Sequence, residues 1–303
     1  MNILIIGLGS IAYKHISVIK EVDKNAVIYA LRSSTSSHSV VGVKDIYNYK
    51  DVKGKIDFCI ISNPTFKHYE TILECINLNV PLFIEKPSVM SLEGAEELKE
   101  LILKKNIITY VAHNLRFHPV IQYLKKYLSN KRIIEVNVFC GSYLPEWRPN
   151  IDYTKNYSAH SKMGGGVHLD LIHEIDYSIY LFGSPEYSTS LKLQISDLNI
   201  DSIDFAAYHL IYKDKVVNII LNYYRKNPKR ELEIILNNDI LTADLLNNTI
   251  TNKEGNILYC LKDYNIVTTY KHQMEYFYRI LKTKEASINT FENSLEILKI
   301  CLK

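Results

Sequence analysis

The sequence is poor in cysteine and has no long uninterrupted hydrophobic run. Its five cysteines are far apart and include no CxxC pair, so we expect neither a disulfide framework nor a structural metal site. No apolar run reaches the roughly 18 residues of a membrane span, and the N-terminus, MNILIIGLGS, has no basic leader. We therefore expect a soluble protein of the reducing cytoplasm, with no membrane partner.

An excess of charge of one sign is also missing. The formal net charge is +3 and the basic residues are scattered, which gives no case for a nucleic-acid partner. Hydrophobic residues make up 47% of the chain, enough for a sizeable core, and this excludes wholesale disorder. At 303 residues the chain is long enough for two domains.

The first part of the chain alternates short apolar runs with helix-length segments. Strands are predicted at 2–7, 26–31, 56–62, 81–85 and 107–112, and helices at 66–78 and 91–105. Strands that alternate with helices indicate βαβ units and a doubly wound parallel sheet, the α/β class.

The pattern changes after RFHP at 116–119. A helix at 120–129 and a strand at 132–142 precede a helix at 164–182. Successive strands at 188–196, 203–213, 216–225 and 229–237, joined by short turn signals, indicate hairpins of an open, mostly antiparallel sheet. Helices follow at 267–282 and 290–302. We predict a nucleotide-binding domain over 1–118 and an α+β domain over 119–303, whose last helices pack back on the first domain.

A glycine-rich turn follows the first strand directly. In Gly7-Leu8-Gly9-Ser10-Ile11-Ala12 the first glycine permits the tight turn and the second lets backbone amides approach a pyrophosphate. The small third residue, Ala12, allows close packing of helix on strand, and the helix N-terminus adds partial positive charge. The placement at the start of a βαβ run predicts a dinucleotide site that includes Ser10 and Ile11.

The end of the second strand bears on which dinucleotide binds. An NAD-preferring site usually has Asp or Glu there for the ribose 2′-hydroxyl, whereas this chain has Arg32, Ser33 and Ser34. A guanidinium suits a 2′-phosphate, and the serines can add hydrogen bonds. We therefore favour NADP over NAD, the alternative being a solvated loop arginine.

Three glycines precede a stretch of ionisable residues in GGGVHLDLIHEIDY at 164–177. On one helix, Asp170, His173, Glu174 and Tyr177 share a face, and aliphatic residues occupy the opposite face. Such a helix is usually a surface helix. The glycines let backbone or ligand approach the helix start, which favours a functional interpretation.

Several of these motifs together resemble the Gfo/Idh/MocA oxidoreductases, the group of glucose-fructose oxidoreductase and inositol dehydrogenase. The resemblance rests on GLGSIA, SNPTFKH at 62–68, EKP at 85–87, NLRFHP at 114–119 and GGGVHLDLIHEIDY. A softer likeness, in GSYLPEWRPNIDYTKNYSA, is to a bacterial subgroup associated with surface sugars. The resemblance implies a Rossmann domain, a C-terminal α/β domain with an open sheet, and a homodimer or homotetramer formed through that sheet.

The resemblance also implies roles for single residues. Lys86 would reach the substrate hydroxyl, Glu85 would lie by the nicotinamide ribose, and Pro87 would fix the turn. Asn63, Pro64 and His68 would line the nicotinamide side.

Asp170 and His173 would face the reacting carbon. Their spacing of three residues differs from the family's four, so Glu174 competes with His173 for the position of the base. His173 suits the base because a histidine is largely neutral near neutral pH. Lys86 could stabilise the alkoxide, and Asp170 could orient the imidazole or bind a hydroxyl.

Aromatic and basic residues near the middle of the chain are candidates for substrate recognition. Arg148 and Tyr153 are favoured over Trp147 in the segment that also holds Tyr143, Asp152 and Tyr157, because aromatic faces stack on sugars and arginines bind phosphate or carboxylate. Arg116 is a further candidate, with a bridging role between domains as its alternative. Since the chain has 23 tyrosines, a structural role is as plausible for any one of them.

The sequence therefore predicts an NADP- or NAD-dependent oxidoreductase that transfers a hydride to or from a secondary hydroxyl or keto carbon of a sugar, sugar acid or sugar nucleotide. No metal is needed for this chemistry. One alternative is a non-catalytic dinucleotide or sugar sensor, which would have no need of Lys86, Asp170 and His173 together. A second is an enzyme whose tightly bound cofactor is recycled internally.

Overall fold

The computed structural model describes residues 1–34 and 39–303, and the chain divides into two compact units. The first unit comprises Met1–Asn114 and Ile266–Glu296, and the second comprises Leu115–Asn265 and Ile297–Lys303. The sequence prediction placed all of 119–303 in the second domain, with the last helices packing back on the first. In the structure α7 (Val267–Thr283) belongs to the first unit.

The first unit is built on a six-stranded sheet in which every neighbouring pair is parallel. The order β3-β2-β1-β4-β5-β6 is that of a doubly wound dinucleotide-binding fold. The strands are β1 (Asn2–Ile6), β2 (Val27–Leu31), β3 (Val43–Ile46), β4 (Phe58–Ile61), β5 (Leu82–Ile84) and β6 (Thr109–Val111). Runs such as NILII and FCII are buried along almost their whole length, as strands covered on both faces must be. The predicted parallel sheet is confirmed; β3 was not anticipated.

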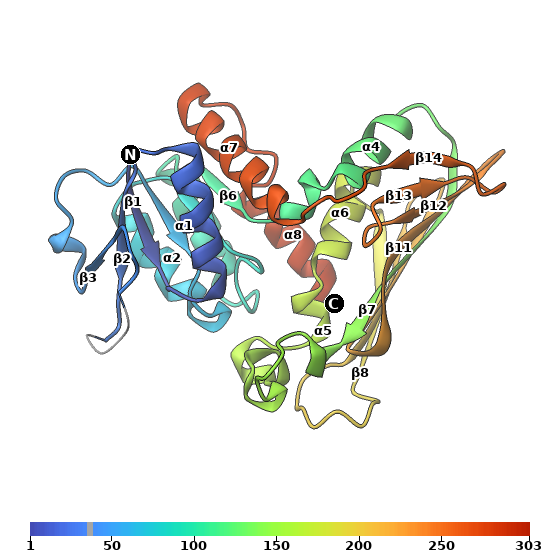
Figure 1. The fold of residues 1–303 in the computed structure, drawn as a ribbon, viewed down its shortest axis with the longest axis horizontal. Helices are drawn as coiled ribbons and strands as arrows, with labels where there is room; N and C mark the ends of the chain where they lie inside the picture. Colours follow the sequence, from blue (N-terminus) through green and yellow to red (C-terminus); the bar gives the residue numbers. More distant parts are fainter. Residues whose placement is uncertain (35–38) are drawn as a thin grey trace. The chain divides into compact units, whose positions relative to one another are not determined.

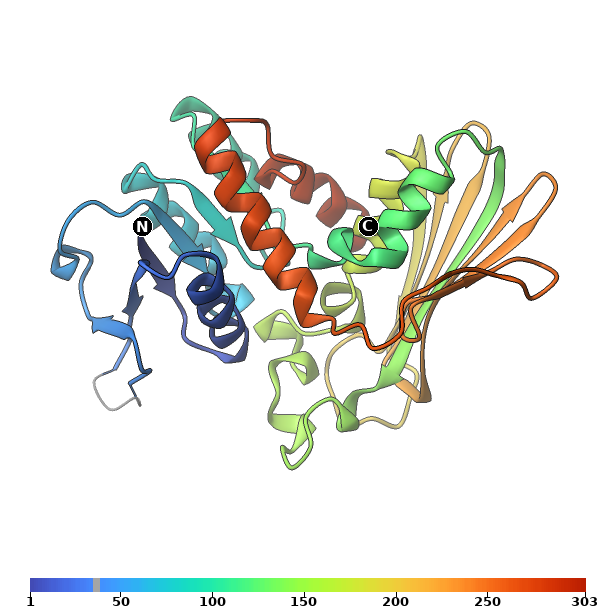
Figure 2. The ribbon, with the colours of Figure 1, turned by 45° about the horizontal axis from the view of Figure 1, so that its top comes forward.

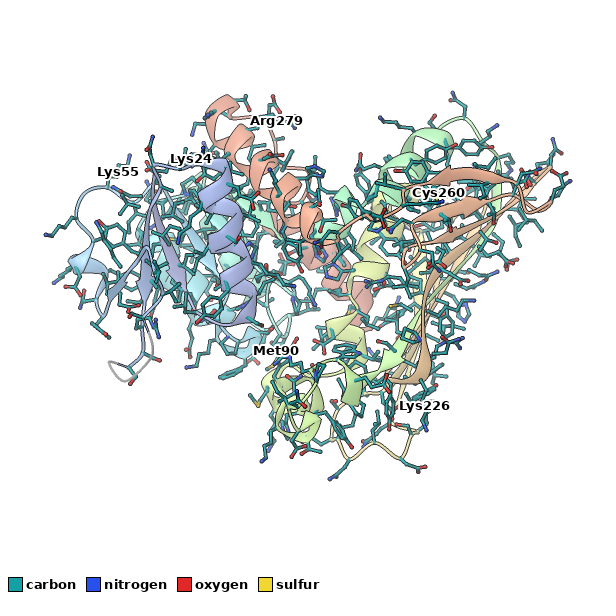
Figure 3. All side chains as sticks on the ribbon, viewed as in Figure 1. Lys24, Lys55, Met90, Lys226, Cys260 and Arg279 are labelled. Carbon is teal, nitrogen blue, oxygen red and sulfur yellow. The ribbon has the colours of Figure 1, made fainter. Side chains whose placement is uncertain are left out.

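Helices cover this sheet. They are α1 (Ser10–Val22), α2 (His68–Asn77), α3 (Ala95–Lys104) and α7, with α8 (Phe291–Leu302) running from the first unit into the second. Figures 1 and 2 show α1 beside α7, and α1 turns its apolar side, with Ile16 and Ile19, into the core. Charged side chains such as Lys24, Lys55 and Arg279 project from the outside of the unit (Figure 3). The turn between β1 and α1 lies at the carboxyl end of a central strand, where ligands bind in open α/β sheets.

The second unit is an eight-stranded, mostly antiparallel sheet with helices on one face (Figure 2). Its strand order is β14-β13-β12-β11-β7-β10-β9-β8. The strands are β7 (Ile133–Tyr143), β8 (Tyr187–Leu193), β9 (Phe205–Ile211), β10 (Val216–Asn222), β11 (Tyr224–Leu236), β12 (Ile240–Asp244), β13 (Thr249–Thr251) and β14 (Ile257–Cys260). The helices are α4 (Pro119–Tyr127), α5 (Val167–Asp170) and α6 (His173–Phe182). The predicted open sheet is confirmed.

Two details of the second unit differ from the sequence prediction. Strands β10 and β11 do not form a hairpin, because β7 lies between them and pairs parallel with β10. The expected turn, RKNPK at 225–229, instead lies within β11, where the pairing with β7 shifts register between Tyr224 and Lys229.

The expected single helix at 164–182 is the second correction. It is two helices, α5 and α6, because the chain leaves helical geometry at Leu171, with φ −100° and ψ 28°.

Among the described residues, no helix combines the length and apolar character that crossing a membrane requires.

Candidate functional site

The loop between β1 and α1 leaves backbone amides available at the start of a helix. Gly7 has φ +91°, and a Cβ placed on it would lie 2.3 Å from the backbone of Asn63, so this position requires glycine. Gly9 is the N-cap of α1, and no side chain caps the helix there. A Cβ on Gly9 would meet no atom within 4 Å. The first-turn amides, which have no partner inside the helix, therefore face open space that an anion can fill.

A cavity of about 570 Å³ adjoins this loop within the first unit. It is lined by Ile6, Gly7, Leu8, Leu31, Arg32, Ser33, Tyr47, Asn48, Tyr49, Asn63, Pro64 and Lys67. The volume is in the range of small-molecule sites. Five of the predicted cofactor residues lie on it: Gly7, Arg32, Ser33, Asn63 and Pro64. The segment Tyr47–Tyr49 and Lys67 were not predicted; Lys67 lies inside the SNPTFKH motif, whereas nothing in the sequence marked Tyr47–Tyr49.

The charged residues that line this cavity are basic. Arg32 and Lys67 contribute side chains, and none of the described lining residues is acidic. The Arg32 guanidinium also pairs with Asp45, Nη1 to Oδ1, at 2.8 Å. That bond uses one edge of a planar group with five donors. The open helix start and the two cations fit a dinucleotide with its phosphates at Gly9–Ala12.

Lys86 follows β5 in a segment that makes a cis peptide bond between Lys86 and Pro87. Its neighbour Glu85 is buried, with Oε1 2.6 Å from Nε2 of His15 on α1. Burial would raise the pKa of Glu85, but the bond to His15 and the charge of Lys86 outweigh burial and hold that pKa below its ordinary value. Glu85 is therefore ionised at neutral pH.

His68 is not placed as the resemblance implies. Its ring is 1% exposed and is absent from the cavity lining. Nδ1 lies 3.0 Å from the Pro87 carbonyl oxygen, and Nε2 lies 2.9 Å from that of Asn63. Since both ring nitrogens face backbone oxygens, we remove His68 from the cofactor-contacting candidates.

In the second unit, Asp170 is the centre of a buried polar cluster. Its Oδ1 accepts a hydrogen bond from the Tyr157 hydroxyl at 2.9 Å, and its Oδ2 accepts one from Tyr223 at 2.5 Å. The negative charge of Asp170 and burial raise the pKa of Tyr157; burial and then Asp170 raise that of Tyr223. Both phenols thus stay protonated and donate. Tyr223, at the β10–β11 junction, was missed because nothing local distinguishes it among 23 tyrosines.

The glycines before Asp170 serve the backbone of this cluster. A Cβ on Gly165 would lie 2.2 Å from the Tyr157 carbonyl oxygen, and Gly166 has φ +127°. The glycines therefore bring the loop of Tyr157 against the start of α5, as close backbone approach requires. His173 is the first residue of α6 and is half-buried.

Most of the polar side of 170–177 is buried, which argues against the alternative of a surface helix. Glu174 is fully buried, and its Oε1 pairs with Nε of Arg230 at 2.6 Å. Because that carboxylate is held by an arginine, the competition for the base position favours His173. Arg116 is likewise committed, since its Nη2 and Nε contact the buried Asp176 at 2.6 and 3.0 Å. We therefore withdraw Arg116 from the substrate-binding candidates and assign it to the core of the second unit.

Two of the remaining substrate candidates, Trp147 and Arg148, lie beside tyrosines of the Asp170 cluster. Trp147 packs edge-on against Tyr223, with ring centroids 5.3 Å apart, and its Nε1 donates to Ser142 at 2.8 Å. The exposed guanidinium of Arg148 lies 6.0 Å from the ring centre of Tyr157. The hydroxyl of Tyr153 accepts a hydrogen bond from the Asn199 amide at 3.2 Å. Of the three, Arg148 is the one that carries a charge, and its side chain is exposed. No group of three or more His, Cys, Asp or Glu residues in the described chain is arranged to hold a metal ion.

The chain is similar to an oxidoreductase family and to several dehydrogenases. Residues 1–113 match the model of the GFO_IDH_MocA family, described as an oxidoreductase family with an NAD-binding Rossmann fold. The chain is 28% identical over 156 residues to scyllo-inositol 2-dehydrogenase (NADP(+)) of Bacillus subtilis, with 51% of this chain and 42% of that protein covered. It is 27% identical to the glucose-6-phosphate 3-dehydrogenase of the same organism, with 71% and 66% covered. The alignments with the first curated relatives span about 42% to 65% of those proteins.

Solved structures match over the full chain. A UDP-N-acetylglucosamine 3-dehydrogenase from Acidithiobacillus ferrooxidans aligns with a TM-score of 0.80 and 17% identity, covering 100% of this chain and 95% of that one. A myo-inositol 2-dehydrogenase from Lactobacillus plantarum aligns with a TM-score of 0.81 and 20% identity, with the same coverage. At these identities the likeness establishes the fold of both units.

Proposed function

We propose that the chain is an NAD(P)-dependent dehydrogenase or reductase, because its residues 1–113 match the model of the GFO_IDH_MocA oxidoreductase family. It would act on a secondary hydroxyl or keto carbon of a sugar, sugar acid or sugar nucleotide. The observation that carries the proposal is the uncapped start of α1 at Gly9, beside a cavity with two cations. The relatives named above, dehydrogenases of cyclitols and of a sugar phosphate, support this class of substrate.

We propose NADP as the preferred cofactor. Arg32 and Lys67 place two positive charges on the cavity, and no described lining residue is an acid that could select a free ribose hydroxyl. Relatives use either cofactor, since an NAD-dependent scyllo-inositol 2-dehydrogenase of Bacillus subtilis also matches. The charge on the cavity is therefore the argument for NADP.

We assign the reaction to three residues. His173 would accept the hydroxyl proton during oxidation, Lys86 would stabilise the developing alkoxide, and Asp170 would bind a substrate hydroxyl or orient the histidine. Asp170 already accepts two tyrosine hydroxyls, so its carboxylate is fixed in place before any substrate arrives. When bound, the nicotinamide takes up or supplies the hydride. Arg148, Trp147 and Tyr153 remain the candidates for substrate recognition.

Fluorescence titration of the purified protein with NADPH and with NADH tests the proposal. We expect saturable binding of both, with NADPH the tighter, followed by oxidation or reduction when sugars, sugar phosphates and sugar nucleotides are screened. Binding with no turnover across such a panel would favour the alternative of a sensor. Nucleotide that survives extensive dialysis would favour an internally recycled cofactor. Binding of neither dinucleotide by folded protein would contradict the proposal.

We also propose that the second unit's open sheet face joins two or four copies. A row of registered side chains on that face, Leu191, Ala207, Ile220 and Phe139, is apolar, with Leu191 52% and Ile220 38% exposed. Exposed apolar surface of this kind marks interaction sites. Light scattering should give the mass of a dimer or tetramer, reduced by Leu191→Lys combined with Ile220→Lys; a monomeric wild type would contradict the proposal.

A further inference from the structure

Two buried histidines hold the segment that carries Lys86. His15 comes from α1 and contacts Glu85, the residue before the lysine. His68 comes from α2 and contacts Pro87, the residue after it. The two side chains are 0% and 1% exposed, so neither is placed to meet a ligand itself.

The contact of His15 fixes both its own tautomer and the position of Glu85. An ionised carboxylate only accepts hydrogen bonds, so Nε2 of His15 must carry the proton in the 2.6 Å contact with Glu85 Oε1. Nδ1 is buried with no hydrogen-bond partner among the described residues, so the contact with Glu85 is the side-chain hydrogen bond that holds this ring. The ring itself packs edge-on against Phe83, with centroids 5.0 Å apart. The second carboxylate oxygen of Glu85 then accepts the amide of Lys86 at 3.3 Å.

The contact of His68 restrains the chain on the other side of Lys86. Its ring lies between the carbonyl oxygens of Asn63 and Pro87, at 2.9 and 3.0 Å. Asn63 lines the cavity, and its backbone is also the one that packs against Gly7. Burial lowers the pKa of His68, so its neutral ring has one N–H: it donates to one of these oxygens and packs against the other, between the cavity wall and the lysine segment.

We propose that His15 and His68 are positioning residues that hold Lys86 from both sides, the first through Glu85 and the second through the Pro87 carbonyl. This inference rests on the proposed function, in which Lys86 is a catalytic residue. It also connects the proposed cofactor site with the proposed catalytic lysine, because His15 lies on α1, whose N-terminus is the proposed phosphate site. Anchoring α1 thereby steadies Glu85 and the lysine that follows it.

Competitive acetylation of lysines, read by mass spectrometry, tests the proposal without substrate or cofactor. In His15→Leu the donor to Glu85 is lost, and we expect the labelling rate of Lys86 relative to exposed Lys24 to change at least about threefold. His15→Gln, whose amide nitrogen can reach the place of Nε2, should restore the rate to within about twofold. His68→Leu and His68→Asn form the same pair on the other side, the Asn nitrogen replacing Nδ1. The exposed His272→Gln of α7 is the matched control.

The pattern across variants separates positioning from stability. A changed labelling rate of Lys86 in the leucine variants, restored in the amide variants, supports the proposal. A fall in turnover with KM unchanged, once a substrate is found, supports it too. Wild-type labelling of Lys86 in both leucine variants would overturn it. If the leucine variants do not fold, ¹⁵N NMR of the wild type decides: a proton on Nε2 of His15 is expected, and a ring with its only proton on Nδ1 overturns the link to Glu85. A protein that fails to bind NAD(P)H would defeat the proposed function while leaving these readouts intact.

Discussion

Two arginine–aspartate pairs, one in each unit, show how differently the two units use the same residues. Arg32 pairs with Asp45 at the cavity, with side chains 10% and 18% exposed. Arg116 pairs with Asp176 in the interior of the second unit, at 6% and 0%. The first arginine lies on the lining of a cavity, whereas the second has its guanidinium directed at a buried carboxylate. The two aspartates differ more in exposure, 18% against 0%, than the two arginines do, so the burial of the carboxylate is what separates the two pairs.

Breaking the buried pair of Arg116 and Asp176 should have the largest effect, and that effect is on the free energy of unfolding. Asp176→Asn leaves the Arg116 charge in the interior without its ionised partner, and we expect a loss of about 3–5 kcal/mol in the free energy of unfolding of the second unit. Urea unfolding measures this loss. The matched control is Asp214→Asn, whose partner Arg132 is 56% exposed, and there the loss should stay below about 1 kcal/mol. Equal losses for the two variants would remove the distinction between the pairs.

Removing a proposed catalytic side chain should have the next largest effect. It should lower turnover and leave the free energy of unfolding nearly unchanged. Lys86→Ala and His173→Ala are each expected to lower turnover at least about a hundredfold, with NADPH affinity close to that of the wild type. Steady-state kinetics with the substrate found by screening, together with NADPH titration, checks both halves. Undiminished turnover in either variant would exclude that residue from the mechanism.

One histidine of the second unit, His118, should make the free energy of unfolding depend on pH. His118 caps α4, its Nδ1 accepting the amide of Val120, and burial followed by the charge of Arg230 lowers its pKa to about 4. The unfolded chain, with a histidine pKa of about 6.5, therefore binds this proton first as the pH falls. The stabilisation is complete above pH 6.5 and is lost progressively down to about pH 4, on the order of 3 kcal/mol.

His118→Asn tests this dependence, because asparagine keeps an N-cap acceptor and does not titrate. Urea unfolding at pH 7 and pH 4.5 should show a smaller pH-dependent loss in the variant than in the wild type. Parallel losses in the two proteins would contradict the assignment to His118.

The smallest effect expected is on cofactor choice. Arg32→Ala removes one of two cations from the cavity and should weaken NADPH binding about tenfold, through the loss of a charge-assisted bond, with little change for NADH. Asp45→Asn, which frees the arginine from its partner, serves as the companion variant and should not weaken NADPH binding. Equal weakening for both nucleotides in Arg32→Ala would contradict the preference for NADP.

The sequence predicted the first unit better than the second because the first unit's features are local. The glycine turn, the apolar strands and Arg32 each lie within a few residues of one another, and chain order almost dictates a parallel sheet once βαβ units are recognised. Strand β3, with its four residues VKDI, is too short and too polar to give an apolar signal. Tyr47–Tyr49 follow it and were missed for the same reason.

In the second unit the informative contacts join residues far apart in the chain. Glu174 meets Arg230 and Asp170 meets Tyr223, and no spacing rule shows either pair. The sequence pattern at 170–177 predicts one helix, but the chain forms two, and Arg230 of β11 covers Glu174 in the interior. The insertion of β7 between β10 and β11 likewise follows from sheet assembly rather than from any turn signal.

The central claim, that a dinucleotide binds with its phosphates at the start of α1, is tested most directly at Gly9. A side chain fits there without contact, and aspartate is among the preferred N-caps, so Gly9→Asp should leave the melting temperature unchanged or slightly raised. Its carboxylate would occupy the amides and repel phosphate, so calorimetric titration should show NADPH affinity reduced at least about a hundredfold, and less in Gly9→Asn. A folded Gly9→Asp protein that binds NADPH as the wild type does would contradict the account.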